Sequence, residues 1–387
     1  MDAKAAARER LFVLQDTLIA LSHRIHAHPE LGFEEVNACT WLAEALSAAG
    51  FAVETGIAEL PTAFAARAGS GPLHVAICAE YDALPGIGHA CGHNLIAAAA
   101  VGAGAALAQV ADEVGLTVRV IGTPAEEVGD AGGKILLLER GAFAGVHAAM
   151  MVHPAPHDVV TPPILAAALF DVHYTGKEAH AAAYPERGIN AADALTVAQV
   201  AIGLLRQHLR ASDRIHGIVT RGGDAPNVIP AHTSARYMVR AQTLAELEAL
   251  RPRVYRCFEA GALATGATLE IKGGSKPYAE MRHDAEIASL YRRNAERLGR
   301  RFDAGSAPRA AASTDMGNVS LALPAIHPLI GIDSWPAVNH QPEFAAHCVS
   351  AAADKALLDG ALALAWTAID LATEPALRQR LLRAPAP

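Results

Sequence analysis

Strand-like and helix-like stretches alternate along this chain, and one block in the middle changes the alternation. Apolar runs of strand length at residues 73–85, 116–129 and 147–156 are separated by helical patterns, which is typical of a largely parallel sheet with helices on both faces. From residue 166 to 274 the order becomes strand, helix, strand, strand, helix, strand. That order is the split βαβ arrangement of a ferredoxin-like domain. We therefore expect an α/β fold with an inserted α+β domain.

The length of 387 residues is also more than a single core usually needs, so two domains are expected. The sequence predicts one discontinuous domain made of residues 1–165 and 276–387, interrupted by a domain made of residues 166–275. After the insertion we expect a helix around 284–300, a turn at 312–318, a strand and a long final helix. Thr243 and Glu246 form a capping-box pattern ahead of the second helix of the insertion.

Charge and cysteine content exclude several classes of protein. A net charge of −8 and a pI near 6.1 argue against binding to nucleic acid or to an anionic membrane, since either needs a basic surface. Five scattered cysteines do not form a disulfide framework and favour a reducing compartment. The N-terminal stretch lacks an apolar signal-peptide core, and the uncharged run 95–111 is short and rich in Ala and Gly. We therefore expect a cytoplasmic protein that contacts no membrane.

Ionisable side chains gather where the predicted strands end. Glu80 and Asp82 lie in the last part of the first run, with Cys91 and His93 shortly after in "HACGHN". The adjacent pair Glu126 and Glu127 lies near the end of the second run. His153 ends the third run, and His340 follows the last strand. The carboxyl ends of parallel strands share one edge of a sheet, so these groups are expected to meet there.

Together these residues have the chemistry of a metal centre. Cys91 and His93 are two residues apart and can reach one ion, and Glu127, His153 and His340 could complete the set. Five such ligands suggest two divalent ions that share a bridge, while Glu126 would take a proton from water held by the ions. Cys91 acting as a nucleophile with His93 is an alternative. A catalytically silent protein that binds a ligand is another.

Six motifs carry a resemblance to a known family. The stretches "RIHAHPELGFEE", "EYDALPGIGHACGHNLIAAAAVGAG", "GTPAEEVGDAGGK", "GKEAHAAAYPERGINAADA", "APNVIPAHTSARYMVRA" and "STDMGNVSLALPAIHP" span about residues 23–345. In this order they resemble the aminoacylase and carboxypeptidase family of co-catalytic metallopeptidases. The chain is most similar to the amidohydrolase branch of that family, and within it to the aminobenzoyl-glutamate and β-alanyl-dipeptide hydrolases.

The resemblance implies a role for each matching residue. It makes Cys91, His93, Glu127, His153 and His340 the ligands of two divalent ions, with zinc favoured over manganese or cobalt, and Glu126 the general base. Asp82 would orient a ligand. The inserted domain would be a lid that also dimerises, with His180 reaching the substrate of the partner subunit to stabilise the oxyanion. Asn227 would lie near the same oxygen, and Arg240 could bind the substrate carboxylate.

The resemblance also implies a reaction and shows two departures from the family pattern. We expect a homodimeric metal-dependent hydrolase that cleaves the amide bond of N-acyl amino acids or dipeptide-like amides. Glu80 stands where the peptidase branches have a ligand histidine, so it could orient a ligand or bind an ion itself. Asn94 stands where many amidohydrolases have Asp, and its effect on the site is open.

Overall fold

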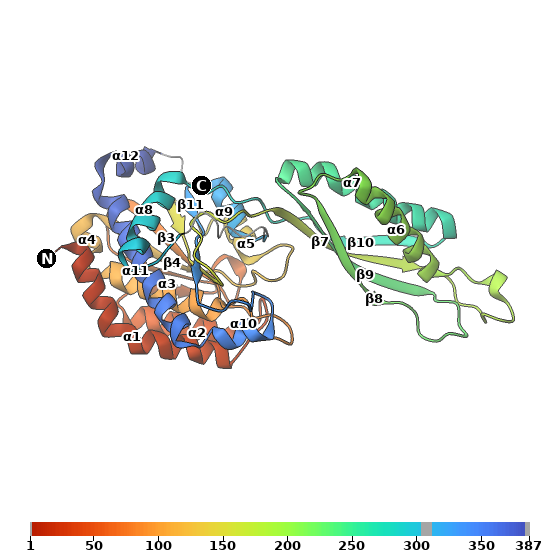
Figure 1. The fold of residues 1–387 in the computed structure, drawn as a ribbon, viewed down its shortest axis with the longest axis horizontal. Helices are drawn as coiled ribbons and strands as arrows, with labels where there is room; N and C mark the ends of the chain where they lie inside the picture. Colours follow the sequence, from red (N-terminus) through yellow and green to blue (C-terminus); the bar gives the residue numbers. More distant parts are fainter. Residues whose placement is uncertain (1, 303–311, 384–387) are drawn as a thin grey trace.

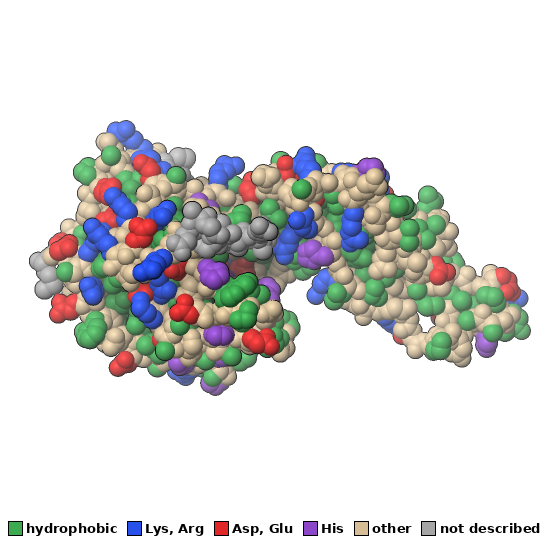
Figure 2. All heavy atoms as spheres, in the orientation of Figure 1, with side chains coloured by type: hydrophobic (Ala, Val, Ile, Leu, Met, Phe, Trp, Pro, Cys, Tyr) green, Lys and Arg blue, Asp and Glu red, His purple; other side chains and the backbone are tan. Residues whose placement is uncertain are grey.

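The computed structural model describes residues 2–302 and 312–383 and has two lobes of unequal size (Figure 1). The larger lobe holds both ends of the described chain. The smaller lobe begins with β7 (Ala166–Thr175) and ends with β10 (Thr268–Gly273). The two lobes meet at a narrow connection in the ribbon (Figure 1), and both lobes can be told apart in the space-filling view (Figure 2). The mixed α/β fold with a mostly parallel sheet is confirmed, whereas the division into a discontinuous domain (1–165 and 276–387) and an inserted domain (166–275) stays a prediction.

A six-stranded sheet forms the centre of the larger lobe, in the order β1-β2-β4-β3-β5-β11. The neighbours β4–β3, β3–β5 and β5–β11 are parallel, whereas β1 and β2 form an antiparallel edge. A second, two-stranded parallel sheet pairs β12 with β6. The strands are β1 (Ala52–Thr55), β2 (Phe64–Ala68), β3 (Leu73–Ala79), β4 (Leu116–Gly122), β5 (Ala148–Met150), β6 (His153–Ala155), β11 (Ala325–Ile326) and β12 (Leu329–Gly331).

Helices cover both faces of this sheet. Because successive side chains of a strand point to opposite faces, Val75 and Ile77 of β3 join one apolar cluster and Ala76 and Cys78 join another. The first cluster includes α1, α3, α8 and α11, and the second includes α5 and α9. The helices of this lobe are α1 (Ala3–Ala27), α2 (Val36–Ala48), α3 (His93–Ala108), α4 (Ala111–Val114), α5 (Gly133–Glu139), α8 (Ala285–Arg297), α9 (Met316–Ala322), α10 (Pro342–His347), α11 (Ala351–Thr373) and α12 (Pro375–Arg383).

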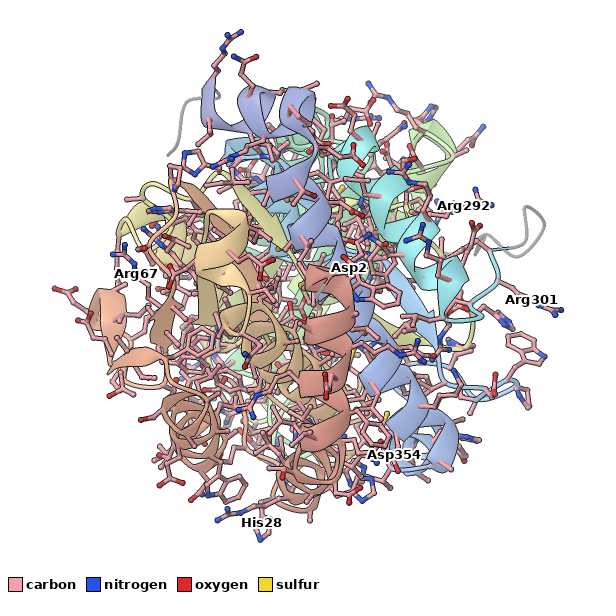
Figure 3. The ribbon with its side chains drawn as sticks, turned by 90° about the vertical axis from the view of Figure 1, so that its left-hand side faces the viewer. Asp2, His28, Arg67, Arg292, Arg301 and Asp354 are labelled. Atoms are coloured by element: carbon pink, nitrogen blue, oxygen red, sulfur yellow. The ribbon has the colours of Figure 1, made fainter. Side chains whose placement is uncertain are left out.

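The Ala- and Gly-rich run is a buried helix, as expected. Every residue of α3 from His93 to Leu107 is buried. Small residues allow close packing: a Cβ at Gly104 would lie 2.6 Å from a methyl of Val120 on β4. Among the described residues, α11 alone has the length and apolar composition of a membrane span, but 78% of its most apolar window is buried. It lies beside α1 and α3 in the core, and Figure 3 shows these helices inside a rim of surface side chains such as Arg67 and Arg292.

Several elements of the larger lobe differ from the sequence prediction. The run 147–156 was predicted as one strand but forms two short strands, β5 and β6, which belong to different sheets. The strands β1 and β2 were not predicted, because β1 is short and mostly exposed and carries no apolar run. The stretch 312–318 was predicted as a turn, but its second half begins α9. Gly and Asn give this segment a weak intrinsic helix propensity. Burial of Met316 and Val319 against the sheet outweighs that propensity.

The smaller lobe is a four-stranded antiparallel sheet in the order β10-β7-β9-β8, packed against α6 (Ala191–Leu205) and α7 (Leu244–Thr265). The other two strands are β8 (Arg214–Arg221) and β9 (His232–Ala241). This is the predicted strand and helix order. The capping box forms only in part, because Thr243 accepts from the Glu246 amide at 3.2 Å while the Glu246 carboxylate pairs with Arg210 at 2.5 Å.

Candidate metal centre

A sharp turn after β3 brings Cys91 and His93 to the carboxyl end of the sheet. His93 is the first residue of α3 and follows Gly92, whose φ of 80° lies in the left-handed region. A Cβ at Gly92 would lie 2.4 Å from Pro154, so only glycine fits between the turn and β6. This close approach places the turn directly against the strand that begins with His153.

Asp82 fixes the orientation of His93. The His93 Nδ1 lies 2.9 Å from Asp82 Oδ1, and Asp82 Oδ2 accepts a hydrogen bond from the Glu127 amide at 2.8 Å. Burial opposes the charged form of His93, but the neighbouring Asp82 outweighs it and raises the pKa of the imidazole well above its usual value. The other ring nitrogen, Nε2, is fully buried and has no hydrogen-bond partner among the described residues. A carboxylate that holds Nδ1 and leaves Nε2 free is the usual arrangement around a metal-binding histidine.

Cys91 and His153 face each other at the same place. The His153 Nδ1 contacts its neighbour's carbonyl, Pro154 O, at 2.8 Å, which leaves Nε2 at 3.4 Å from the Cys91 Sγ. Burial is the main reason that the pKa of the Cys91 thiol lies well above its usual value, and Glu127 adds to it. The same burial lowers the pKa of His153 to about 4, so its imidazole is neutral and available as a ligand.

Glu127 and His340 complete this side of the cluster. The Glu127 Oε1 lies 3.2 Å from His340 Nε2 and 3.9 Å from His93 Nε2. His340 has a positive φ of 69°, which is uncommon for a residue other than glycine, and its amide donates to Ala90 O at 2.8 Å. Strained backbone of this kind is frequent where side chains must be held for function.

The residues present fit divalent ions. Three overlapping groups place one ligand atom of each member within 4.8 Å of the others, and their unpartnered buried atoms include His93 Nε2 and Glu127 Oε1. Thiolate, imidazole and carboxylate ligands together suit zinc or a similar ion. These groups are Cys91 with His93 and His153, Cys91 with Glu127 and His340, and His93 with Glu126 and Glu127.

Glu126 lies deeper than Glu127 and in a different environment. Its Oε2 is 3.9 Å from His93 Nε2, and it forms a fourth close group of carboxylates with Glu80 and Asp315. Burial is the largest cause of a pKa well above the usual value for Glu126, and the charge of Glu80 is the next. A raised pKa is what a group needs in order to hold a proton during a reaction near neutral pH.

Lys134 is the residue near the site that sequence reasoning missed. It lies in α5 with no exposed surface, and its Nζ is 2.6 Å from both Glu80 Oε1 and Asp315 Oδ1. The Lys134 ammonium therefore forms ion pairs with two of the three carboxylates in the fourth group. One signal existed in the sequence, namely a single Lys at the start of the apolar stretch "KILLL". A second missed residue is the buried His327, whose ring centroid lies 5.4 Å from that of His153.

Residues 76–361 match Peptidase family M20/M25/M40. The chain belongs to this family. The Xaa-Arg dipeptidases of mouse and human are 41% and 40% identical to it; the alignments cover 97% and 94% of this chain, and 90% and 87% of those proteins. One of the subunits of the p-aminobenzoyl-glutamate hydrolase of Escherichia coli is 34% identical over 70% of this chain and 59% of its own length. The predicted family is confirmed, and the M20 chain is therefore a hydrolase of the peptidase and amidohydrolase type.

Solved structures of the M20 type share the fold. The Bacillus subtilis YXEP protein, described as a dinuclear metal binding peptidase from the M20 family, has a TM-score of 0.63 and 24% identity and covers 91% of this chain and 98% of its own. An aminobenzoyl-glutamate utilization protein from Klebsiella pneumoniae has a TM-score of 0.70 and 20% identity, with 90% and 97% covered. At these identities the likeness supports the fold of the M20 chain.

The two departures from the family pattern now have physical explanations. Glu80 is paired with Lys134 through Oε1, while its Oε2 lies 3.5 Å from His93 Nε2 and remains within reach of an ion held there. Asn94 points away from the cluster. Its amide nitrogen donates to Ser22 Oγ at 2.9 Å and to Cys348 O at 3.1 Å, so Asn94 joins α3 to α1 and to the end of α10.

The residues of this M20 chain that were predicted to bind substrate lie in two separate regions of the smaller lobe. The loops that carry His180 and Asn227 are joined, since the Ala181 amide donates to Asn227 O at 3.0 Å, and both side chains are exposed. These loops lie at the end of the smaller lobe farthest from the larger lobe (Figure 1). Arg240 lies instead near the connection, where its Nη1 donates to Ser313 Oγ at 2.6 Å. Within one chain, the structure brings Arg240 toward Glu126 but keeps His180 and Asn227 apart from it.

Proposed function

We propose that this M20 hydrolase is a metal-dependent dipeptidase. The observation that supports this most is the mostly buried cluster of Cys91, His93, Glu127, His153 and His340, in which His93 Nε2 and Glu127 Oε1 lack hydrogen-bond partners and beside which Glu126 lies. N-acyl amino acids are the wider substrate class. Dipeptides that end in arginine are the first substrates to test, because the mouse and human relatives that align with nearly the whole chain are named Xaa-Arg dipeptidases.

The chain's own residues would divide the work of hydrolysis. Two divalent ions bound by the five ligands would lower the pKa of water and polarise the substrate carbonyl. Glu126 would accept the proton of the attacking water and deliver it to the leaving amine, and the burial that raises its pKa favours holding that proton between the two steps. Asp82 would keep His93 in the orientation that binds, and Arg240 could hold the substrate carboxylate.

We further propose a homodimer in which His180 and Asn227 act on the partner's substrate. Their distance from the cluster of their own chain in Figure 1 supports this arrangement, because a second chain or a large movement must bring them to a site. Zinc is the favoured ion, because one ligand is a thiolate, with manganese and cobalt as alternatives. A cytoplasmic location belongs to the same proposal, and it is supported by five cysteines that are all free and buried.

Cysteine nucleophilic hydrolysis is the less favoured mechanism. The predicted base, His93, and also His153 lie beside Cys91, but the burial that raises the pKa of the thiol is the opposite of what an activated cysteine needs. Chelation distinguishes the two mechanisms. A metal hydrolase loses activity when the ions are removed and regains it when zinc, manganese or cobalt is restored, whereas a cysteine hydrolase remains active throughout.

The proposal is tested by replacing the base. Glu126→Gln keeps the shape of the side chain but cannot take the proton, so turnover of Xaa-Arg dipeptides should fall by about 10²- to 10⁴-fold while the bound metal is retained. Glu54→Gln, which removes an exposed carboxylate of β1, is the control and should be fully active. An active Glu126→Gln enzyme would refute the role of Glu126. Absence of hydrolysis across a panel of dipeptides and acyl-amino acids with each metal would refute the dipeptidase.

A further inference from the structure

The loop that carries Glu126 has a strained backbone. It connects β4 to α5, and both Ala125 and Ala131 have positive φ, at 58° and 54°. A residue with a side chain is strained in such a conformation, so the surroundings must hold it in place. The larger lobe supplies part of this support, since the Ala125 amide donates to Glu35 Oε1 at 2.7 Å and the Glu127 amide donates to Asp82 Oδ2 at 2.8 Å.

The rest of the support comes from residues 274–278, the segment by which the chain returns from the smaller lobe. The Asp130 carboxylate accepts from the amides of Gly274 and Lys276, each at 3.0 Å, and the Ala131 amide donates to Lys276 O at 3.1 Å. Five hydrogen bonds in all join this return segment to the loop 125–132, and the remaining two belong to the hydroxyl of Tyr278.

Tyr278 makes the contacts nearest to the base. Its hydroxyl donates to the carbonyl oxygen of Glu126 at 2.5 Å and accepts from the Gly129 amide at 3.1 Å. The side chain is 3% exposed, and burial raises the pKa of Tyr278 well above its usual value, so the hydroxyl keeps its proton and can donate. In phenylalanine the ring would remain but both hydrogen bonds would be lost.

The same tyrosine is paired with the strand that enters the smaller lobe. The backbone of Tyr278 exchanges two hydrogen bonds with Ala167, at 2.9 and 3.0 Å, and Ala167 is the second residue of β7. The two chain crossings between the lobes are therefore joined at this residue, at the connection seen in Figure 1. A change in the direction of β7 would move Tyr278, and the Tyr278 hydroxyl would pass that movement to the backbone of Glu126.

We propose that Tyr278 is a positioning residue for Glu126, which couples the placement of the smaller lobe to the placement of the catalytic base. This inference rests on the proposed function of Glu126. A base displaced by about 1 Å can cost about 10²-fold in rate, whereas substrate binding by groups elsewhere is little affected. Tyr278→Phe should therefore lower kcat by about 10- to 100-fold and leave KM within about 3-fold, with the metal content unchanged.

The test compares Tyr278→Phe with Tyr174→Phe. Tyr174 is also a buried tyrosine, and it donates to a backbone carbonyl, Phe258 O, at 2.8 Å, but it lies in the core of the smaller lobe. Hydrogen exchange of peptides that cover 125–133 is measured beside kcat and KM with an Xaa-Arg dipeptide. We expect faster exchange and a lower kcat in Tyr278→Phe alone. Asp130→Asn, which weakens the bonds to Gly274 and Lys276, should shift both readouts the same way if Tyr278→Phe does not fold.

Three results would overturn the proposal. They are an unchanged kcat in Tyr278→Phe, an unchanged exchange rate in 125–133, and equal effects in Tyr174→Phe, which would indicate general destabilisation. Failure of the proposed function is distinguishable from these. If the wild-type protein hydrolyses nothing in the panel while exchange in 125–133 rises in Tyr278→Phe, the link between return segment and loop stands and the assignment of Glu126 as a base falls.

Discussion

Two groups of charged residues lie side by side in this protein, and they differ in whether the chain itself supplies a lysine to the carboxylates. The carboxylates of Glu80 and Asp315 have a cation of the chain's own, because Lys134 Nζ lies 2.6 Å from each. The neighbouring ligand cluster has none: its buried His93 Nε2 and Glu127 Oε1 lack hydrogen-bond partners among the described residues. Buried charges need compensation, so Lys134 balances part of the charge of the first group, while the ligand atoms of the second group are arranged to accept ions from outside.

The largest effect on stability is expected for the group of Lys134, Glu80 and Asp315. Lys134→Met would leave two carboxylates buried without their partner, which should lower the free energy of unfolding by about 3–5 kcal/mol. Denaturant unfolding measures it. Lys355→Met is the matched control, because Lys355 also pairs with a carboxylate but is 64% exposed, and its loss should cost less than about 1 kcal/mol. Equal effects for the two lysines would mean that the Lys134 group does not contribute as a buried network.

A smaller loss of stability is expected when Asn94 is replaced. This residue joins α3 to α1 and to the end of α10 beside the ligand cluster. Asn94→Asp would replace a donor by a carboxylate facing Cys348 O, so we expect a loss of about 1–3 kcal/mol from the unmet carbonyl and the buried acid. Metal content should stay as in the wild type, because the side chain points away from the cluster. Elemental analysis of the purified variant checks this, and a change in metal content with unaltered stability would contradict our interpretation of Asn94.

The smallest effect on stability is expected for the ion pair of Asp171 and Arg236, which lies on the surface of the sheet of the smaller lobe. The hydrogen bond from Arg236 is the main cause of a lowered pKa of Asp171, so the stabilisation is present above the usual carboxyl range and is lost as the pH falls below about 4. Comparison of Asp171→Asn with the wild type in thermal unfolding should show a difference below about 1 kcal/mol at pH 7 that shrinks on acidification. If the stability difference between the wild type and Asp171→Asn grew as the pH fell, the lowered pKa of Asp171 would be contradicted.

The sequence was informative about one of the two buried groups and nearly silent about the other. Cys91, Glu127 and His153 follow strands that are parallel neighbours, so their meeting could be predicted from strand order and strand ends alone. Lys134 lies in α5 and Asp315 immediately precedes α9. These two short helices meet only through tertiary packing, and no periodicity in the sequence indicates that they do.

The role of Tyr278 was hidden for a similar reason. Its two hydrogen bonds join residues about 150 positions apart, and an aromatic residue after a strand has no distinguishing pattern. The positions of His180 and Asn227 could be predicted only as far as their loops. Which site they serve depends on a second chain or on a movement of the lobe, and neither follows from local sequence.

The most direct test of the difference between the two groups is a count of bound metal ions per chain in the wild type, His93→Ala and Asp315→Asn. We expect two divalent ions in the wild type, a loss of at least one in His93→Ala, and full retention in Asp315→Asn, because Asp315 is paired with Lys134. A His93→Ala protein with as much metal as the wild type, or an Asp315→Asn protein that loses its metal while remaining folded, would contradict this expectation.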